Sequence, residues 1–184
     1  MTRPRTLTEY LQTPQAPWSS LLIVPQGATA TAIAKVPAGF ALRVLNGKKC
    51  STPAGLFTEF GKVLDFPGYF GHNWDAMEEC LADLEWLPAK GYVLLIAEAQ
   101  AVLADDEDEY ETLLEILSDA GEAWSKGQAS GGSKAIAFHT LFAVSHREAP
   151  KRKHWGLESA PSPDLQSPTK GRSSRPAKNG RTPQ

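Results

Sequence analysis

Apolar and polar positions in the middle of the chain recur with periods that predict strands and helices in a fixed order. Residues Phe40–Leu45 (FALRVL) form a short apolar run that ends at the turn dipeptide Asn46-Gly47. Ser51–Pro53 then offers a capping hydroxyl and a proline, as at a helix start. The next apolar positions have the spacing of a helical face: Leu56, Phe57, Phe60, Val63 and Leu64.

Further elements follow in the same alternating manner. A second helix is expected from about Asn73 to Leu87. Residues Tyr92–Ala97 (YVLLIA) are nearly continuously apolar, which is typical of a strand covered by helices on both faces. A third amphipathic helix opens with the acidic run Asp105–Glu109, and Ala135–Val144 is the last strand. This order predicts an α/β fold in which a small parallel sheet is packed with helices.

The two ends of the chain differ from this middle part. Residues 1–39 are expected to be an N-terminal extension whose first 18 residues form a loosely held arm, with one added strand near Ser20–Pro25. Residues 40–147 form the predicted domain. Residues 148–184 are rich in Pro, Ser, Lys and Arg, with almost nothing apolar after Leu157. Such a segment buries too little surface to offset the entropy of ordering, so a disordered basic tail is expected.

Charge is distributed unevenly between these parts. Residues 41–147 hold 8 basic and 17 acidic residues, whereas residues 148–184 hold 8 basic and 3 acidic ones. An acidic body therefore carries a basic tail, and opposite signs in two segments indicate different roles. The tail is interpreted as a solubilising extension, with contact to nucleic acid or acidic surfaces as the alternative.

The cellular setting follows from what the sequence lacks. Two cysteines, Cys50 and Cys80, do not make a disulfide framework in a chain of 184 residues. The sequence contains no run of about 18 apolar residues, so no membrane span is expected. The first 18 residues lack the apolar centre of a secretory signal, so a cytoplasmic protein is expected. No cofactor is implied.

The second predicted helix carries the strongest functional signal. Asp75, Glu79 and Asp83 follow one another at i, i+4 and i+8, with Glu78 beside them. No Lys or Arg occurs between positions 62 and 90, so the nearby sequence offers this acidic stripe no partner. A solvated helix face is the plain explanation of charge on a helix. That explanation is weaker here because the stripe has a single sign.

An aromatic and glycine-containing turn precedes the stripe. Residues Tyr69–Trp74 (YFGHNW) provide more ring surface than a turn requires, and Asn73 suits the N-cap position of the helix. Interfaces favour aromatic anchors beside desolvated charges. A loop and helix of this kind suit a cationic, phosphate-binding cleft, because carboxylates can stand where phosphate oxygens would.

These residues carry a family resemblance. The segments NGKKC and FPGYFGHNWDAMEECL, followed by a short apolar strand, resemble the barstar family of intracellular inhibitors of secreted bacterial ribonucleases. The resemblance runs from about Phe40 to Val144 and is most specific in the pattern Y-[YF]-G-x-N-x-D-A. It implies a three-stranded parallel sheet packed with helices, a non-enzymatic inhibitor, and a basic ribonuclease or related toxin as the protein partner.

The resemblance also implies a binding segment, with Glu79 as the carboxylate that enters the nuclease site most deeply and Asp119 as a contact from the following helix. Glu79 replaces a shorter Asp, and Glu78 stands where the family's namesake has a tryptophan. The expected partner-binding residues are Tyr69, Phe70, Gly71, Asn73, Trp74, Asp75, Glu78, Glu79 and Asp119.

Other functions fit these residues less well. Asp75 and Glu79 as an acid/base pair, assisted by His72 or His139, would make an enzyme, but two carboxylates on an exposed helix lack a pocket that separates their pKa values. The run Asp105–Glu109 lacks the alternating ligands and central glycine of a calcium loop. A barstar-fold interaction module or immunity protein for a non-ribonuclease partner remains the alternative.

Overall fold

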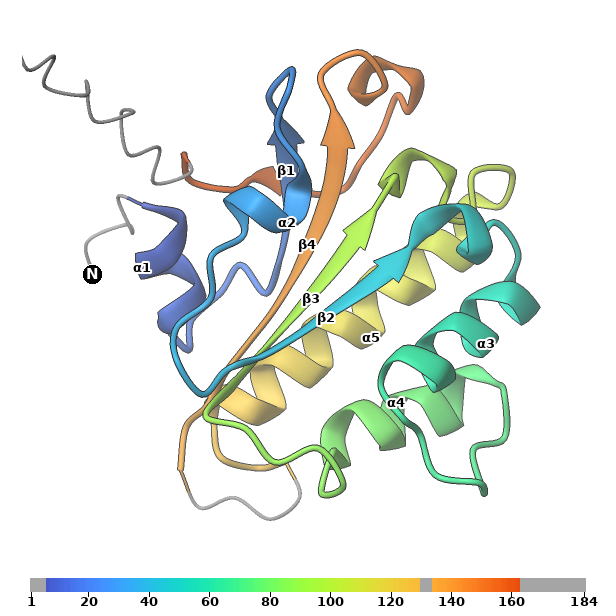
Figure 1. Cartoon of the computed structure of the whole chain (residues 1–184). Helices are drawn as coiled ribbons and strands as arrows, with labels where there is room; N and C mark the ends of the chain where they lie inside the picture. Colours follow the sequence, from blue (N-terminus) through green and yellow to red (C-terminus); the bar gives the residue numbers. More distant parts are fainter. Residues whose placement is uncertain (1–5, 130–133, 163–184) are drawn as a thin grey trace, which may run out of the picture.

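The computed structural model describes residues 6–129 and 134–162. These residues form five strands and five α-helices, joined in places by short 3-10 turns (Figure 1). In chain order they are α1 (Leu7–Gln12), β1 (Ser19–Val24), α2 (Ala30–Ile33), β2 (Ala41–Asn46), η1 (Gly47–Cys50), α3 (Pro53–Val63), α4 (Trp74–Asp83), β3 (Gly91–Ala97), η2 (Ala99–Ala101), α5 (Glu107–Ser125), β4 (Ala137–Ser145), η3 (Ala149–Lys151) and β5 (Glu158–Ser159).

The strands form one parallel sheet in the order β2-β3-β4-β1-β5. The predicted α/β class and parallel sheet are confirmed, but the expected number of strands is wrong, because the sheet has five strands and not three. The three expected strands β2, β3 and β4 lie side by side, and β1 and β5 extend the sheet beyond β4.

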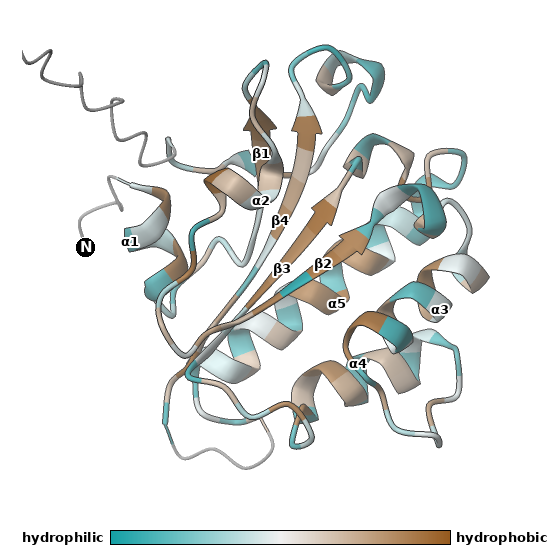
Figure 2. Cartoon of the chain, viewed as in Figure 1, coloured by the Kyte–Doolittle hydropathy of each residue, from teal (hydrophilic) through white to brown (hydrophobic). Residues whose placement is uncertain are grey.

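Helices cover the sheet on both faces, and the strands between them are the most apolar part of the chain (Figures 1 and 2). On one face α3, α4 and α5 enclose the larger core, into which β3 sends Tyr92, Leu94 and Ile96. On the other face α1 and α2 enclose a smaller core with Val93 and Leu95. The continuous apolar run of β3 therefore reflects burial on both sides, as expected.

The N-terminal arm is not loosely held in the residues that the structure describes, which corrects the expectation from sequence. Helix α1 begins with a capping box formed by Thr6 and Glu9, and it buries Leu7 and Leu11 against the sheet. The hydroxyl of the buried Tyr10 donates to the carbonyl oxygen of Pro17 at 2.7 Å. Three apolar side chains on one face of this short helix are enough to dock it.

The expected disorder after residue 147 is likewise wrong as far as residue 162. Strand β5 pairs with β1, and Trp155 and Leu157 pack against the larger core. The guanidinium of Arg152 lies 3.6 Å from the centre of the Tyr110 ring and donates to the carbonyl oxygen of Val102 at 2.7 Å. The predicted disorder of residues 163–184 concerns a segment outside the described residues.

Side-chain caps fix where the three main helices begin. Thr52, Asn73 and Asp106 each accept a hydrogen bond from a backbone N–H in the first turn of α3, α4 and α5, respectively. The predicted N-cap role of Asn73 is confirmed. Helix α4 ends at Asp83 and not at Leu87, because Leu84 adopts the left-handed conformation (φ 46°).

Candidate functional site

The turn before α4 is anchored to the domain by a cluster of buried aromatic rings. Phe70 is only 8% exposed, and its ring centre lies 4.9 Å from that of Phe66 and 6.5 Å from that of Phe57. A side chain at Gly61 would approach the Phe70 ring to 3.2 Å, so the ring fills the space above α3. Phe70 therefore anchors the turn and has little surface left for a partner.

Tyr69, its neighbour, points the other way. It is 75% exposed, and among the described residues only Val44 is also a large hydrophobic side chain with high exposure. The pKa of the Tyr69 hydroxyl is raised above its usual value, first by desolvation and then by the negative charge of neighbours, of which Asp83 acts most strongly and Glu79 also contributes. The ring thus stands beside the acidic side of α4.

Asn73 ties the turn to the helix through both ends of its amide. Its side-chain oxygen accepts from the N–H of Ala76 at 2.9 Å, and its side-chain nitrogen donates to the carbonyl oxygen of Gly71 at 3.3 Å. Between them His72 has a positive φ of 50°. Asn73 and Gly71 are exposed, so they lie at the surface while fixing the backbone that presents Tyr69.

Trp74 joins the first turn of α4 to α5. Its ring packs edge-on against Phe57 at 4.9 Å, and its indole N–H donates to the Glu109 carboxylate at 2.5 Å. At the other end of the helix pair, the indole N–H of Trp124 donates to the carbonyl oxygen of Leu81 at 2.8 Å. Two tryptophans therefore hold α4 against α5, and the acidic face of α4 is presented by a rigid support.

The four carboxylates predicted to bind a partner all reach solvent, whereas Asp83, the last member of the predicted stripe, is half-buried and its Oδ1 atom is shielded from solvent. Asp75, Glu78 and Glu79 on α4 and Asp119 on α5 are exposed, whereas Met77, Cys80 and Leu81 on the opposite side of α4 are buried. No Lys or Arg among the described residues forms an ion pair with any of the four carboxylates. The predicted two-faced helix is confirmed, and the exposed carboxylates of its acidic face form no ion pair within the described residues.

Glu78 and Asp119 both line a groove between α4 and α5. The groove has a volume of about 310 Å³ and an alanine floor that includes Ala82 and Ala120. Lys126 also lines this groove, but its ammonium group is paired with Glu122. The acidic surface therefore continues from Tyr69 across α4 to Asp119 on α5.

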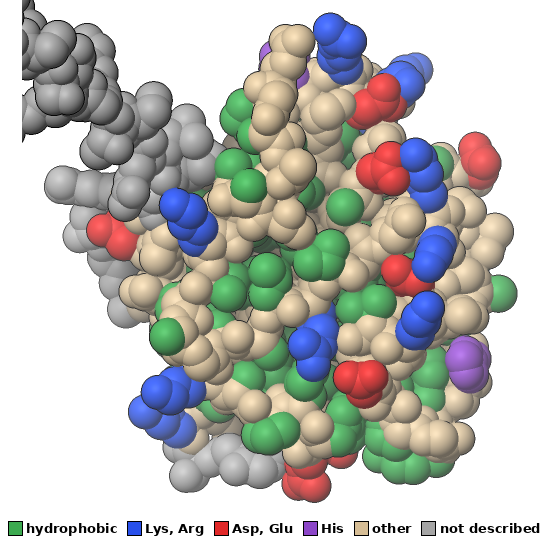
Figure 3. Space-filling view, viewed as in Figure 1, with side chains coloured by type: hydrophobic (Ala, Val, Ile, Leu, Met, Phe, Trp, Pro, Cys, Tyr) green, Lys and Arg blue, Asp and Glu red, His purple; other side chains and the backbone are tan. Residues whose placement is uncertain are grey.

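Charges elsewhere on the domain behave differently. On the face with β2 and α3, acidic and basic side chains stand beside one another (Figure 3). They include the pairs Lys48–Glu98, with 2.6 Å between nitrogen and oxygen, and Lys49–Glu59, with 3.5 Å. Pairing is thus usual on that surface, whereas α4 concentrates one sign of charge.

The two histidines of the enzymatic alternative lie in different places: His72 is exposed in the turn before α4, beside the Phe70 ring, whereas His139 is far from that helix. His139 on β4 is fully buried on the α1 side of the sheet, where its Nε2 atom lies 2.8 Å from the carbonyl oxygen of Thr13. Burial lowers the pKa of this imidazole. Asp75 and Glu79 lie on a helix that covers the opposite face, so His139 is a core residue and cannot assist them.

The acidic run before α5 has structural roles. Asp106 caps the helix, and Glu109 accepts the Trp74 hydrogen bond. No group of His, Cys, Asp or Glu side chains within residues 6–129 and 134–162 is arranged to hold a metal ion. Every helix in this part of the chain is too short or too polar to span a bilayer.

Sequence reasoning missed two residues that shape the site. The sequence indicates Glu109 only as part of a helix start, although its carboxylate accepts a hydrogen bond from Trp74, 35 positions earlier in the chain. Phe57 was assigned to a helical core face, which is right, but its contacts with Phe70 and Trp74 were not foreseen. No local signal in the sequence reveals such long-range pairs.

Comparison with known families supports the resemblance found in the sequence. The family model described as Barstar (barnase inhibitor) matches residues 40–143, which is more than half of the 184 residues. This match confirms the predicted family and includes every residue of the acidic surface. A search of curated proteins returned no match.

Proposed function

The chain belongs to the barstar family, and we propose that it inhibits a basic ribonuclease by covering the enzyme's active site with the acidic face of α4. In this proposal Asp75, Glu78 and Glu79, with Asp119 from α5, take the places of RNA phosphates in a cationic cleft. Tyr69 is the aromatic anchor beside them. The protein acts in the cytoplasm as an inhibitor and not as an enzyme.

The observation that carries the proposal is a set of four exposed carboxylates, none of which forms an ion pair with a Lys or Arg of the described residues. Like charges held close together repel, at a cost of about 0.2–0.5 kcal/mol for each i, i+4 pair such as Asp75 and Glu79. A cationic partner removes this repulsion. An acidic patch also steers a basic partner into contact, which raises the association rate at low salt.

Rigidity of the support favours the same function. Asn73 caps α4, and the indole groups of Trp74 and Trp124 fix it to α5, so binding orders few additional groups. An interface that is formed in advance loses less conformational entropy on association. In the proposal, Phe70 contributes by holding the turn from below, and Gly71 leaves the turn surface open to the partner's backbone.

The test is an inhibition assay with a panel of small, basic, secreted ribonucleases, including those of the source organism. We expect stoichiometric inhibition of RNA cleavage that weakens as salt is added. Asp75→Asn and Glu79→Gln each remove one charged hydrogen bond worth about 1.5–3 kcal/mol, so the inhibition constant should rise about tenfold or more. The loss should lie mainly in the dissociation rate.

Glu98→Gln is the matched control. Glu98 is an exposed carboxylate at the carboxyl end of β3, paired with Lys48, and an exposed pair of this kind contributes about 0–1 kcal/mol. Its neutralisation should leave inhibition within about twofold of the unmodified chain. Equal effects of the Glu79 and Glu98 substitutions would place the binding face elsewhere.

The alternative is a partner that is a toxin other than a ribonuclease. The observation in its favour is Glu78, which adds a charge where the family's namesake has a tryptophan. In that case none of the ribonucleases is inhibited, and a different basic protein is retained by the unmodified chain but not by the Asp75→Asn or Glu79→Gln variants.

A further inference from the structure

Strands β1 and β4 are neighbours in the sheet. The segment that follows β1 packs on one face of the sheet, and the segment that follows β4 packs on the other. After β1 the chain enters α2, whose Ile33 packs in the smaller core beneath α1. After β4 it turns the other way, and Trp155 and Leu157 pack against the larger core on the α5 side. The two strands are parallel and directly hydrogen-bonded, so the chain leaves both of them at their neighbouring carboxyl ends.

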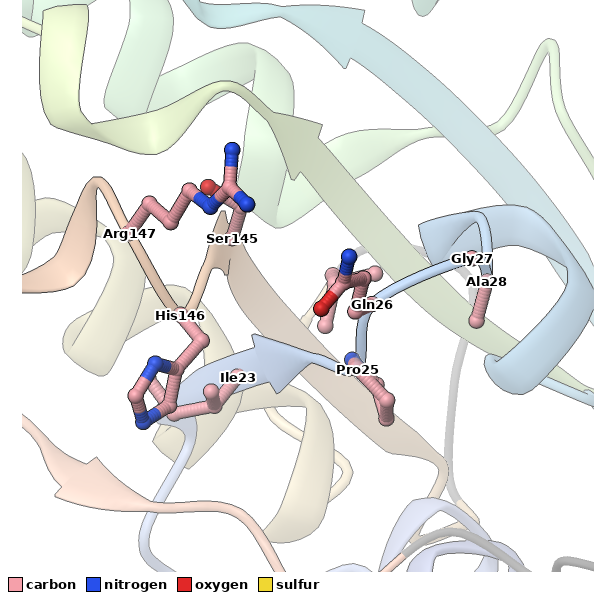
Figure 4. Close-up of a pocket in the computed structure, with 9 residues that line it drawn as sticks. Ile23, Pro25, Gln26, Gly27, Ala28, Ser145, His146 and Arg147 are labelled. Carbon is pink, nitrogen blue, oxygen red and sulfur yellow. The ribbon is translucent and has the colours of Figure 1, made fainter.

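In open α/β sheets, such a reversal between adjacent strands leaves a crevice outside their carboxyl ends, and ligands bind there. This chain has a cavity of about 580 Å³ at that place, within the range of 300–1,000 Å³ common for small-molecule sites. The walls are the end of β1 with its loop and the loop after β4: Ile23, Val24, Pro25, Gln26, Gly27, Ala28, Ser145, His146 and Arg147 (Figure 4).

The lining combines an apolar floor with a polar rim. Ile23, Val24 and Ala28 supply aliphatic surface, whereas Gln26 stands on the loop after β1 and Arg147 on the loop after β4 (Figure 4). Arg147 is exposed and forms no ion pair with the described residues. A guanidinium with no carboxylate partner at the mouth of an apolar cavity suits a ligand with an anionic group.

This cavity is separate from the acidic face of α4. All nine lining residues lie outside positions 40–143, the part matched by the family model. The cavity exists because residues 1–39 add β1 to the edge of β4 and because the segment after β4 leaves on the opposite face. The cavity is therefore formed by segments that lie outside the region matched by the family model.

We propose that this cavity binds a small amphipathic anion, namely a molecule with a compact apolar body and one carboxylate or phosphate group. The apolar body lies on Ile23, Val24 and Ala28. The anionic group is bound by Arg147, with Gln26 and His146 as additional donors. Carboxylate and phosphate share the geometry that a guanidinium recognises, and the probes below distinguish them.

The test is calorimetric titration of the full chain with octanoate and octyl phosphate as anionic probes. Octanol serves as the apolar body without charge, and acetate and inorganic phosphate serve as charge without an apolar body. We expect at least one of the two amphipathic anions to bind at one site, more tightly than octanol, acetate or inorganic phosphate. The one that binds more tightly identifies the preferred head group, and NMR shifts should concentrate at residues 23–28 and 145–147.

Substitutions locate the binding. Arg147→Gln should weaken binding of either anion about tenfold or more, while octanol is unaffected. Lys62→Gln, which removes an exposed cation from α3, is the matched control and should change nothing. Ala28→Phe should fill the floor and weaken all amphipathic probes. Saturable binding of neither anion, or equal affinity in the Arg147→Gln and unmodified chains, would overturn the proposal.

Discussion

Replacing Glu109 with alanine removes the acceptor for the indole N–H of Trp74 and should loosen the contact between α4 and α5. A hydrogen bond to a charged group contributes about 1.5–3 kcal/mol, and the half-buried position of Glu109 favours the lower end of this range. Glu109 also lies in the first turn of α5, where an acidic side chain adds about 0.3–1 kcal/mol through the helix dipole. The expected loss in the free energy of unfolding is about 2 kcal/mol.

The assay is urea unfolding, together with thermal unfolding, in which a chain of this size should lose about 4–8 °C in Tm. Asp108→Ala is the matched control because Asp108 lies in the same helical turn and its carboxylate forms no hydrogen bond or ion pair with the described residues. It should cost only the dipole contribution. The difference between the two variants measures the hydrogen bond to Trp74.

A double-mutant cycle with Trp74→Phe makes the test stricter. If the indole N–H and the Glu109 carboxylate interact, the two substitutions should show a coupling energy of about 1 kcal/mol or more. Equal losses for Glu109→Ala and Asp108→Ala, with no coupling between Glu109 and Trp74, would refute the view that this contact holds α4 in place.

Three further predictions concern the rest of the fold. Phe70→Ala should lower the free energy of unfolding, measured with urea, by about 3–5 kcal/mol, and Phe70→Leu should lower it clearly less. Equal small losses for the two variants would show that the ring does not support the turn. Arg152→Met should lower the free energy of unfolding by about 2 kcal/mol and expose residues 149–159 to proteases, because the contacts with Tyr110 and Val102 are lost. Unchanged protease resistance would contradict this role of Arg152. Burial raises the pKa of Tyr10 from 10.0 to about 12, so its contribution to stability is complete below pH 10 and is lost as the pH rises to about 12. Tyr10→Phe should therefore reduce the loss of stability over this pH interval, and an identical pH profile would contradict the assignment.

Much of the fold between residues 40 and 144 could be predicted because its signals are local. Helix caps such as Thr52 and Asn73, the helical spacing of Leu56, Phe57 and Phe60, and the apolar run of β3 each specify their own element. The predicted end of α4 is wrong because Leu84 adopts the left-handed conformation. Leucine rarely adopts this conformation, so the sequence gives no sign of it.

The parts outside this region depend on long-range packing. Strand β5 is only two residues long and forms because β1 offers it an edge, while Arg152 and Trp155 hold the segment before it. Composition alone indicated disorder there, because a polar segment with two anchoring side chains resembles a disordered one. In α1, three apolar side chains among prolines gave too weak a pattern to predict docking.

For the candidate site, periodicity predicted which side of α4 is acidic, and the structure agrees because Met77, Cys80 and Leu81 must be buried on the other side. The sequence did not distinguish the exposed Tyr69 from the buried Phe70, since adjacent aromatic residues in a turn have no periodicity. It also did not reveal the support given by Glu109, which comes from a distant helix.

The proposed inhibition requires that the carboxylates of α4 occupy the positions of RNA phosphates in a nuclease active site. The most direct measurement is a competition titration, in which a ribonuclease inhibited by this chain is first saturated with a non-cleavable deoxydinucleotide bound at its catalytic cleft. We expect strict competition, with the apparent affinity of the chain falling in proportion to the occupancy of the cleft. Formation of a ternary complex of chain, nuclease and nucleotide would contradict it.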